Sequence, residues 1–366
     1  MKKIFIVVSF SLVSAWGFAQ SKTDAVFKKK FIKNIMEDAA AWQLRHPKHD
    51  PKDWTNGAFY AGLVAAGETT KSKSIWNALM DMGNAQAWQP YKRWYHADDI
   101  TICQTYIDLY RRRKDKALIQ PTIDTINKLL ANPYPTRGRI EVIKWWWCDA
   151  LFMAPPVLVK LSNVTNNNAY IDSSDVYFKQ AYELLYNKEE HLFARDLNYV
   201  IKPDGSGRKE ANGQKVFWSR GNGWVMGGLV RVLSEFPKNY AGRPFYETLF
   251  KEMANRVASL QQEDGLWRAS LLDPEAYPGG EVSGSGFFCY ALSWGINNKL
   301  LDKEKFLPVV EKAWRSLVNC VDENGRVGWV QPIGASPGKN FSKDSWEVYG
   351  TGAFLLAASE VIKLSR

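Results

Sequence analysis

The sequence predicts an all-α protein that folds as an (α/α)6 barrel of six helical hairpins. Segments rich in charge, with apolar residues every three or four positions, alternate with apolar segments that carry few charges, and there are six of each kind. Strand-type alternation of Val, Ile and Thr is scarce. The 366 residues include 16 Trp, 16 Tyr and 18 Phe, which is enough apolar mass for one large closed core.

The charge-rich segments are expected to form the outer helices of the barrel. In one of them, Tyr246, Leu249, Phe250, Met253 and Val257 follow the helical period, so one face is apolar and the other is polar. A helix of this kind lies on a surface with its apolar stripe toward the core. The six expected outer helices are Ala25–Gln43, Lys73–Trp88, Gln120–Ala131, Ser173–Tyr186, Pro244–Gln262 and Lys303–Val321.

The apolar segments are expected to form the inner helices, because a helix with few charges is buried on most sides. Each follows a polar or aromatic loop, and they recur as a degenerate internal repeat. They are Ala58–Ala66, Ile100–Tyr110, Ala150–Leu161, Trp224–Leu233, Gly286–Ile296 and Gly352–Ile362. An open α-solenoid is the alternative, but these segments carry too few charges for a solvated concave face. If the inner helices run parallel, their N-termini converge on one mouth, where free N–H groups suit an anion.

The first 19 residues are expected to be a signal peptide. Lys2 and Lys3 precede an apolar run that ends at Phe18, and Gly17 and Ala19 are small residues suited to a cleavage site. The run is shorter than the ~20 residues of a membrane-spanning helix. No linker interrupts the remainder, so residues 20–366 are expected to form one catalytic domain. We expect an exported protein, periplasmic or secreted, with no membrane span after cleavage.

The net charge of +10 suits an anionic partner such as nucleic acid, phosphate or an acidic sugar. No nucleic-acid-binding signature is present. The one dense basic run, Arg111 to Lys114, is interpreted as a solvated helix end.

Cysteines and histidines are too dispersed to suggest a metal site. The four histidines show no metal-binding spacing, and no CxxC motif occurs. We therefore expect neither a metal nor a cofactor. Three of the four cysteines are expected to be buried free thiols, because they lie in apolar helical stretches: Cys103, Cys148 and Cys289, the fourth being Cys320.

Asp149 follows three consecutive tryptophans, Trp145 to Trp147. Three such neighbours cannot all face one core, so some are expected to line a cleft, where aromatic faces stack on sugars. Desolvation beside these rings raises a carboxyl pKa, as a general acid requires. The plainer interpretation is an N-terminal helix cap beside packed tryptophans.

Two further segments carry candidate site residues. Asp98 and Asp99 are either helix caps or the source of the second carboxylate that a sugar hydrolase needs. In the run from Phe217 to Trp224, the Arg220 guanidinium matches a carboxylate, and Trp218 and Trp224 are placed to bracket a ring. The glycines of this run would let the backbone approach a ligand. Phosphate-loop spacings are absent, which excludes nucleotide binding.

Three motifs together resemble glycoside hydrolase family 105, the unsaturated rhamnogalacturonyl hydrolases, which are related to the unsaturated glucuronyl hydrolases of family 88. They are Trp147-x-Asp149, the Trp-Ser-Arg-Gly-Asn-Gly-Trp run 218–224, and Trp54-x-Asn56-Gly57. The resemblance covers the chain from about Asp53 onward. It implies an (α/α)6 barrel that removes a 4,5-unsaturated uronic acid from the non-reducing end of lyase-generated oligosaccharides by hydration of a vinyl ether.

The same resemblance implies roles for individual residues. Asp149 would protonate C4 and help to activate the water that adds at C5. Asp98 would be the second aspartate, with Asp99 as the alternative in register. The implied substrate contacts are Asn56, Trp147, Trp218, Arg220 and Trp224.

The chain departs from the family pattern at two places. Arg195 stands where family members often carry a histidine, and Arg137-Gly138-Arg139 stands where another histidine is expected. These departures leave the sugar in the +1 position open. We hypothesise that Arg195 contributes to substrate binding.

Three other functions fit parts of the pattern. An inverting glycosidase would use Asp149 with Asp98 or Asp99 on saturated glycosides. A sugar epimerase would call for histidine bases, which this histidine-poor chain does not offer. An exported glycan-binding protein would explain the tryptophans and the basic charge, but not an aspartate within the aromatic cluster.

Overall fold

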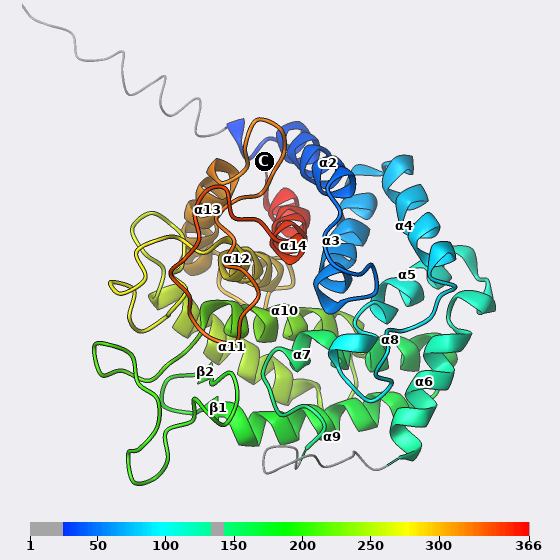
Figure 1. Cartoon of the computed structure of the whole chain (residues 1–366), viewed down its shortest axis with the longest axis horizontal. Coiled ribbons are helices and arrows are strands. Elements are labelled where there is room, and N and C mark those ends of the chain that lie inside the picture. The colour runs from blue at the N-terminus through cyan, green and yellow to red at the C-terminus, as the bar shows by residue number, and fades with distance from the viewer. Residues whose placement is uncertain (1–24, 133–142, 366) are drawn as a thin grey trace, which may run out of the picture.

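Six inner helices surround one axis in the part of the chain that the structure, a computed structural model, describes: residues 25–132 and 143–365 (Figure 1). They are α3 (Trp54–Thr70), α5 (Cys103–Arg113), α8 (Pro155–Thr165), α10 (Ser219–Glu235), α12 (Val282–Asn297) and α14 (Val348–Leu364). The short α7 (Ala150–Met153) precedes α8. A new helix begins at Pro155 because proline has no N–H to continue the previous hydrogen-bond ladder.

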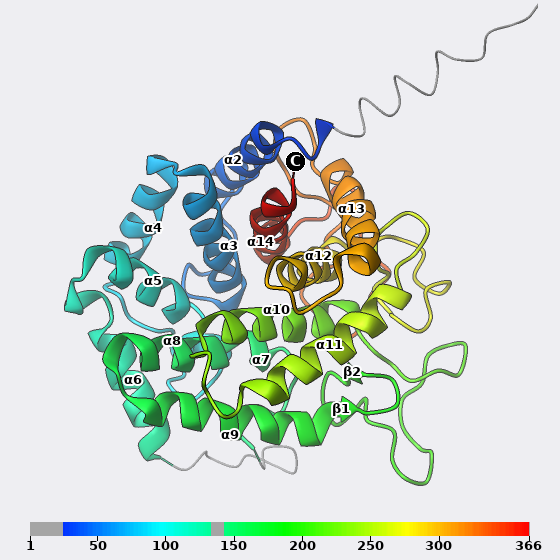
Figure 2. The ribbon, with the colours of Figure 1, turned by 180° about the vertical axis from the view of Figure 1, so that it is seen from behind.

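Six outer helices cover this inner set (Figures 1 and 2). They are α2 (Lys29–Arg45), α4 (Lys73–Ala85), α6 (Gln120–Ala131), α9 (Asn168–Leu185), α11 (Arg243–Ser259) and α13 (Lys303–Asn319). The predicted (α/α)6 barrel is therefore confirmed. Among the outer helices, the largest boundary difference is at α9, which begins at Asn168 rather than at Ser173, because the Asn167 side chain accepts a hydrogen bond from the Ala169 N–H and caps the helix there.

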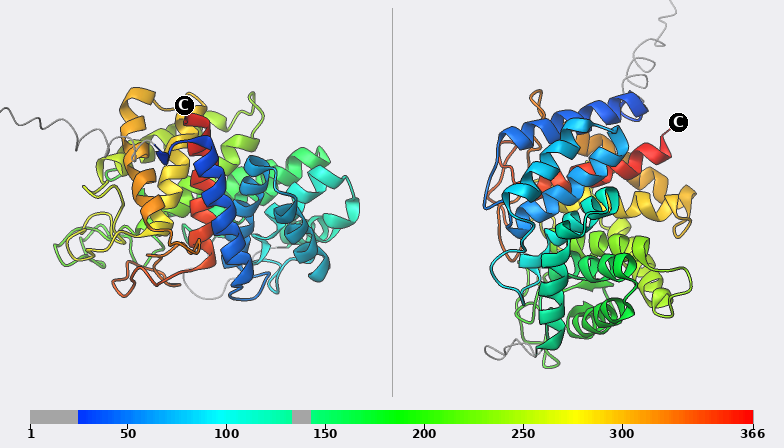
Figure 3. Two further views of the ribbon diagram at one scale, coloured as in Figure 1. Left: turned by 90° about the horizontal axis from the view of Figure 1, so that it is seen from above. Right: turned by 90° about the vertical axis from the view of Figure 1, so that its right-hand side faces the viewer.

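The remaining regular elements are short. They are the 3-10 helices η1 (Asp98–Ile100) and η2 (Lys116–Leu118), and the strands β1 (Tyr186–Asn187) and β2 (Leu192–Phe193). The two strands pair antiparallel, with Tyr186 opposite Phe193 and Asn187 opposite Leu192. Seen from the side, the irregular segments that precede the inner helices collect at one end of the barrel (Figure 3). This end carries the candidate active site.

The first and last inner helices close the barrel through glycines. A Cβ atom on Gly62 of α3 would lie 2.5 Å from the backbone oxygen of Gly352 in α14, and one on Gly352 would lie 2.6 Å from the oxygen of Ala58. No side chain fits at either position. The backbones of α3 and α14 therefore touch directly, which closes the ring of inner helices.

Several sequence-based expectations can be compared with this structure. All four cysteines are free thiols, and Cys103, Cys148 and Cys289 are buried, as expected, while Cys320 is half-buried. Within the described residues, no helix has the length and apolar character needed to span a bilayer. The expected signal peptide, and the segment Arg137-Gly138-Arg139, lie outside the described residues.

The basic run at the end of α5 is a helix end with Arg112, Arg113 and Lys114 exposed, as interpreted, but two of its arginines also make specific contacts. Arg111 donates two hydrogen bonds to the Glu235 carboxylate, at 2.6 and 2.7 Å. Arg112 pairs with Glu68 at 2.9 Å, and its guanidinium lies 3.7 Å from the centroid of the Trp76 ring. These cations link α5 to neighbouring helices, because the C-terminal ends of the inner helices gather here.

Candidate active site

Asp98 and Asp149 lie close together at the mouth formed by the N-terminal ends of the inner helices. Asp98 belongs to η1, which leads into α5, and Asp149 immediately precedes α7. Their side chains are only 19% and 12% exposed. Burial, and next the negative charge of Asp149, raise the pKa of Asp98 to about 7. Asp98 can therefore keep a proton up to near neutral pH, which an ordinary aspartate does not.

Arg195 lies beside Asp149. Its Nε is 3.4 Å from Asp149 Oδ2, and its Nη1 donates to Asp196 Oδ2 at 2.7 Å. Nε is buried and has no hydrogen-bond partner among the described residues. The backbone is fixed as well, because the Cys148 N–H donates to the Arg195 carbonyl oxygen at 2.8 Å. The guanidinium is thus anchored at one edge and retains hydrogen-bonding capacity next to Asp149.

The Asn222 side chain holds the strand that leads to Arg195 and so helps to place Arg195 beside Asp149. Its Oδ1 accepts a hydrogen bond from the Phe193 N–H at 2.8 Å, and its Nδ2 donates to the Phe193 carbonyl oxygen at 3.1 Å. Nδ2 also donates to the Trp218 carbonyl oxygen at 3.1 Å. Since β2 ends at Phe193, this clasp holds the strand that leads into Arg195. The run 218–224 therefore positions an active-site loop from within the first turn of α10.

Asp99 faces a different partner from Asp98. It is 2% exposed, and its Oδ1 accepts from Arg93 Nη2 at 2.5 Å while its Oδ2 accepts from the Arg93 N–H at 2.7 Å. The Asp99 carbonyl oxygen also accepts from the Tyr91 N–H at 2.9 Å. Asp99 thus fixes the loop before η1, and the structure brings together Asp98 and Asp149 rather than Asp99 and Asp149.

His96 is a site residue to which the sequence analysis gave no role. Its ring packs on Trp147, with the centroids 4.7 Å apart, and its Nδ1 lies 3.6 Å from Asp98 Oδ2. Burial and the charge of Arg93 lower the pKa of His96 to about 4, so the ring is neutral at neutral pH. Nδ1 accepts from the Asp98 N–H at 3.3 Å, which places the ring proton on Nε2. In the sequence, the position of His96 two residues before Asp98 is the feature that could have indicated this contact.

The predicted aromatic contacts are mostly buried. Trp147 is 3% exposed, Trp218 donates from Nε1 to Gln331 Oε1 at 3.1 Å, and Trp224 packs between Phe152 and Phe287 with no exposed surface. Trp218 and Trp224 therefore do not form an open pair around a sugar ring in this structure. Trp54 and Trp146 are two half-exposed indoles near the mouth, and they rest on Tyr349 and Trp147 respectively.

Arg220 and Asn56 make contacts within the protein. The Arg220 guanidinium has no exposed surface, and it donates to the carbonyl oxygens of Gln331 and Pro332 at 2.7 and 2.9 Å. Asn56 Nδ2 donates to the carbonyl oxygens of Lys48 and Asp50 at 2.8 and 2.9 Å. Both side chains therefore hold loops at the mouth, and the predicted Arg220–carboxylate contact is not one that its Nη atoms are free to make here.

The glycines of the run 218–224 also serve packing within the protein. A Cβ atom on Gly221 would lie 3.1 Å from Cys148 Sγ, and one on Gly223 would lie 3.2 Å from the Gly284 Cα. We expected these glycines to let the backbone come close to a ligand. In the structure they let it come close to Cys148 and to Gly284 of α12 instead. Among the described residues, no group of three or more His, Cys, Asp or Glu side chains is arranged to hold a metal ion.

Comparison with known proteins gives consistent results. The model of a protein family described as Glycosyl Hydrolase Family 88 matches residues 27–365. A protein of Formosa agariphila named "Unsaturated 3S-rhamnoglycuronyl hydrolase" is 46% identical over 367 residues, covering 98% of this chain and 95% of that protein. A solved structure of a family 88 glycosyl hydrolase from Bacteroides vulgatus is 31% identical, with a TM-score of 0.83 over 92% of this chain and 99% of that one.

A further solved structure is named as a polysaccharide lyase. It is 33% identical to this chain, with a TM-score of 0.84, and the match covers 92% of this chain and 98% of that one. A lyase creates the unsaturated sugar that an unsaturated uronyl hydrolase consumes, so these two names describe opposite changes in the same double bond.

Proposed function

The chain belongs to Glycosyl Hydrolase Family 88, and from that membership we propose that it removes a 4,5-unsaturated uronic acid from the non-reducing end of rhamnoglycuronyl oligosaccharides. The relationship to families 105 and 88 expected from the motifs is confirmed, and the chain is a glycoside hydrolase. The observation that carries the proposal is the Asp98–Asp149 pair with Arg195 against Asp149. It offers one proton donor, one carboxylate and one cation at a single mouth.

The reaction that we propose begins with protonation of C4 by Asp149. The positive charge then resides on C5 and the ring oxygen, and a nearby carboxylate stabilises it. Water adds at C5 and gives its proton back to a carboxylate of the pair. The hemiketal at C5 opens to a keto acid, which leaves C1 as a hemiacetal, and its collapse to an aldehyde releases the neighbouring sugar.

Arg195 decides which carboxyl group holds the proton. Without substrate, the guanidinium lies 3.4 Å from the Asp149 carboxyl group, and Asp98, whose pKa is raised to about 7, is the group that can keep a proton. The uronate carboxylate of the substrate offers Arg195 a second anionic partner. As the guanidinium turns toward that carboxylate, Asp149 loses its cation and becomes the better proton acceptor. In this proposal, substrate binding itself converts Asp149 into the acid.

Asp98, rather than Asp99, is the second carboxyl group in this mechanism. Asp99 is held by Arg93 through its side chain and backbone, which fixes it in the wall of the site. Neutral His96 lies beside Asp98 and adds no charge that would drive the proton off it. Asp98 is therefore free to exchange a proton with Asp149.

The experiment that tests the proposal follows the ultraviolet absorbance of the C4=C5 bond in lyase-generated rhamnoglycuronyl oligosaccharides. Wild type is compared with Asp149→Asn and with Asp38→Asn, a matched change at an exposed aspartate on α2. We expect absorbance to fall with wild type and Asp38→Asn and to persist with Asp149→Asn. Falling absorbance with Asp149→Asn at the wild-type rate would contradict the role given to Asp149.

The same readout separates three competing functions. A lyase acting on the intact polysaccharide would raise the absorbance, because it forms the double bond, and the 33% identical lyase structure is the observation that makes this test necessary. An inverting glycosidase would cleave saturated glycosides and leave the absorbance unchanged. A glycan-binding protein would bind the oligosaccharides and produce neither change.

We also propose that residues 1–19 are removed and that residues 20–366 are the exported catalytic domain. The charged start, the apolar run and the small residues at the cleavage site support this proposal. N-terminal sequencing of protein collected outside the cytoplasm of the producing cell tests it. The expected first residue is Gln20, and recovery of an intact Met1 start would contradict it.

A further inference from the structure

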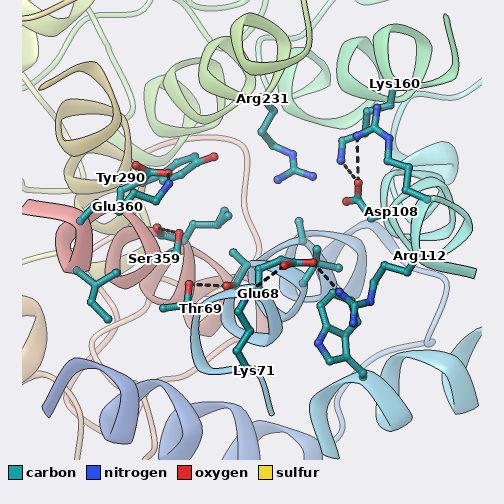
Figure 4. Close-up of a pocket in the computed structure, with 18 of the residues that line it drawn as sticks. Glu68, Thr69, Lys71, Asp108, Arg112, Lys160, Arg231, Tyr290, Ser359 and Glu360 are labelled. Carbon is teal, nitrogen blue, oxygen red and sulfur yellow. Dashed lines mark hydrogen bonds and ion pairs between the residues drawn. The ribbon is translucent and has the colours of Figure 1, made fainter. Parts of the chain in front are cut away.

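A cavity of about 790 Å³, whose lining side chains are drawn in Figure 4, opens at the opposite end of the barrel from Asp98 and Asp149. Residues from α3, α5, α8, α10, α12 and α14 line it, so every pair of the barrel contributes its inner helix. The lining residues of these helices lie beyond the first turn, whereas the candidate active site lies where the helices begin. We call this space the far-end cavity. Its size is within the range of roughly 300–1,000 Å³ that is typical of small-molecule sites.

The lining of the far-end cavity carries an excess of positive charge. Seven Lys and Arg side chains face three acidic ones. Each acidic group already has a basic partner: Glu68 pairs with Arg112 at 2.9 Å, Glu360 pairs with Lys363 at 2.6 Å, and Asp108 pairs with Lys160. Arg111 is paired in addition with Glu235, which is not part of the lining, and Lys71 with Glu68, so of the buried cations in the lining Arg231 is the one for which the described residues offer no ion pair.

Arg231 is the buried cation without an acidic partner. It is 9% exposed and projects from α10 into the cavity, between Tyr290 and Lys160 in the view of Figure 4. Its Nε donates to the neutral Gln104 Oε1 at 2.5 Å, and its Nη2 is buried with no hydrogen-bond partner among the described residues. A buried guanidinium costs much desolvation free energy unless an anion or a hydrogen-bond acceptor compensates it.

The neighbours of Arg231 respond to its uncompensated charge. Burial lowers the pKa of Lys160, and the charge of Arg231 lowers it further, against the opposing effect of Asp108. Burial raises the pKa of Tyr290, against the opposing effects of the Arg231 charge and of a hydrogen bond with Arg231, so the phenol stays neutral: it solvates the guanidinium but does not balance its charge. Two buried cations thus face the same space: Lys160 is paired with Asp108 and lies 3.8 Å from Glu235, whereas Arg231 has no acidic partner among the described residues.

We propose that the far-end cavity binds a small oxyanion, namely a sulfate, phosphate or carboxylate group, with Arg231 Nη2 as its central donor. The Tyr290 hydroxyl can donate a second hydrogen bond, and Lys71 at the open rim attracts the anion from solvent. The cavity is larger than a bare ion, so the group either brings water or belongs to a larger molecule such as a sugar acid. The C-termini of the inner helices carry partial negative charge, which accounts for basic residues here in general but not for an unpartnered Nη2.

Equilibrium dialysis of the full chain against radiolabelled sulfate, at constant ionic strength in chloride, tests this proposal. The Arg195→Ala background removes the cation of the active site, so that remaining binding reports on the far-end cavity. We expect saturable binding in this background and a loss of affinity of at least about tenfold when Arg231→Gln is added, since a hydrogen bond to a charged group is lost. Equal affinity with and without Arg231→Gln, or no saturable binding in Arg195→Ala, would overturn the proposal.

A second variant serves if Arg231→Gln does not fold. Ala65→Phe places a ring in the cavity from a half-exposed position on α3 and removes no side-chain hydrogen bond. It is expected to weaken sulfate binding as well, whereas Arg326→Gln, at an ion pair outside the cavity, is the matched control and should not. Unlabelled phosphate and glucuronate are added as competitors. Displacement by either supports an oxyanion site, and the stronger competitor identifies the source, whereas displacement by neither would overturn the proposal. These readouts do not depend on catalytic activity.

Discussion

Arg195 Nε lies 3.4 Å from Asp149 Oδ2, although Arg195 belongs to the loop after β2 and Asp149 to the turn before α7. Two backbone links make this contact possible: the Cys148 N–H bonds to the Arg195 carbonyl oxygen, and Asn222 clasps Phe193. The contact joins the residue implied to be the proton donor with the residue that departs from the family pattern. Its consequences can be measured.

Replacing Arg195 tests its role in binding the substrate carboxylate. We expect Arg195→Ala to lower kcat/KM by about ten- to a hundredfold, since a charge-assisted hydrogen bond is lost, with a clear rise in KM. Arg256→Ala is the matched control, because Arg256 pairs with Glu190 away from the two aspartates. Steady-state kinetics on the unsaturated oligosaccharide provides both constants. Unchanged KM and kcat in Arg195→Ala would remove Arg195 from the mechanism.

The raised pKa of Asp98 predicts the pH dependence of activity. Below about pH 7 the Asp98–Asp149 pair keeps the proton that C4 must receive, and above it that proton is lost. We therefore expect kcat/KM to fall as pH rises through about 7. A pH profile of kcat/KM for wild type provides the measurement, and a rate that keeps rising to pH 9 would show that the pair is not the source of the proton.

The same pKa makes a prediction for stability. Asp98 is more basic in the folded protein than in the unfolded chain, so ionisation destabilises the fold as pH rises from about 4 to about 7. Asp98→Asn removes this effect, and we expect it to raise the free energy of unfolding at pH 8 by up to about 4 kcal/mol. At pH 4 the gain should be much smaller. Urea unfolding of both proteins at the two pH values measures the difference, and an equal gain at both would contradict the assignment.

Asn222→Ala tests the clasp on Phe193. The variant leaves the buried Phe193 N–H without its acceptor, which is expected to cost about 2–3 kcal/mol in the free energy of unfolding. Because the strand before Arg195 loosens, KM should rise as well. Asn255→Ala, at an exposed asparagine on α11, should change neither quantity. A destabilised Asn222→Ala with wild-type KM would show that the clasp supports the fold but does not position Arg195.

Trp224 is predicted to act through stability rather than substrate contact. Its ring is fully buried between Phe152 and Phe287, so Trp224→Ala should cost about 3–5 kcal/mol of folding free energy. Trp146→Ala, at a half-exposed indole near the mouth, should cost less and raise KM more. Denaturant unfolding and KM for the two variants separate these effects. A higher KM in a stable Trp224→Ala would restore its predicted role in substrate binding.

Most of the fold was predictable because helical period and charge distribution are local properties of the sequence. Alternation of charge-rich and apolar helices specifies both layers of the barrel, and the chain order specifies the hairpins. Boundaries depend on capping side chains, and the cap at Asn167 extended α9 beyond its charge-rich part. The ion pair between Arg111 and Glu235 at the far end of the barrel could not be predicted from the sequence, because it joins two helices that are distant along the chain.

The candidate site was predictable in part. Parallel inner helices imply that residues at their N-terminal ends meet, and Asp98 and Asp149 do meet. The direction in which a side chain points was not predictable in the same way. Arg220 and Asn56 stand at the mouth as expected, but their donors turn to backbone carbonyl groups, which sequence does not reveal. The individual site assignments remain predictions until the variants above are measured.

The direct backbone contact between Gly62 of α3 and Gly352 of α14 has a consequence for how the chain reaches its final form during synthesis. During synthesis α3 is made long before α14, so the face of α3 that contacts α14 remains uncovered while the helices between them are made. A ribosome that stops before α14 would release a chain with a permanent gap in its inner wall. Chaperones and proteases would therefore recognise truncated chains readily, and quality control of this protein is expected to depend strongly on its final hairpin.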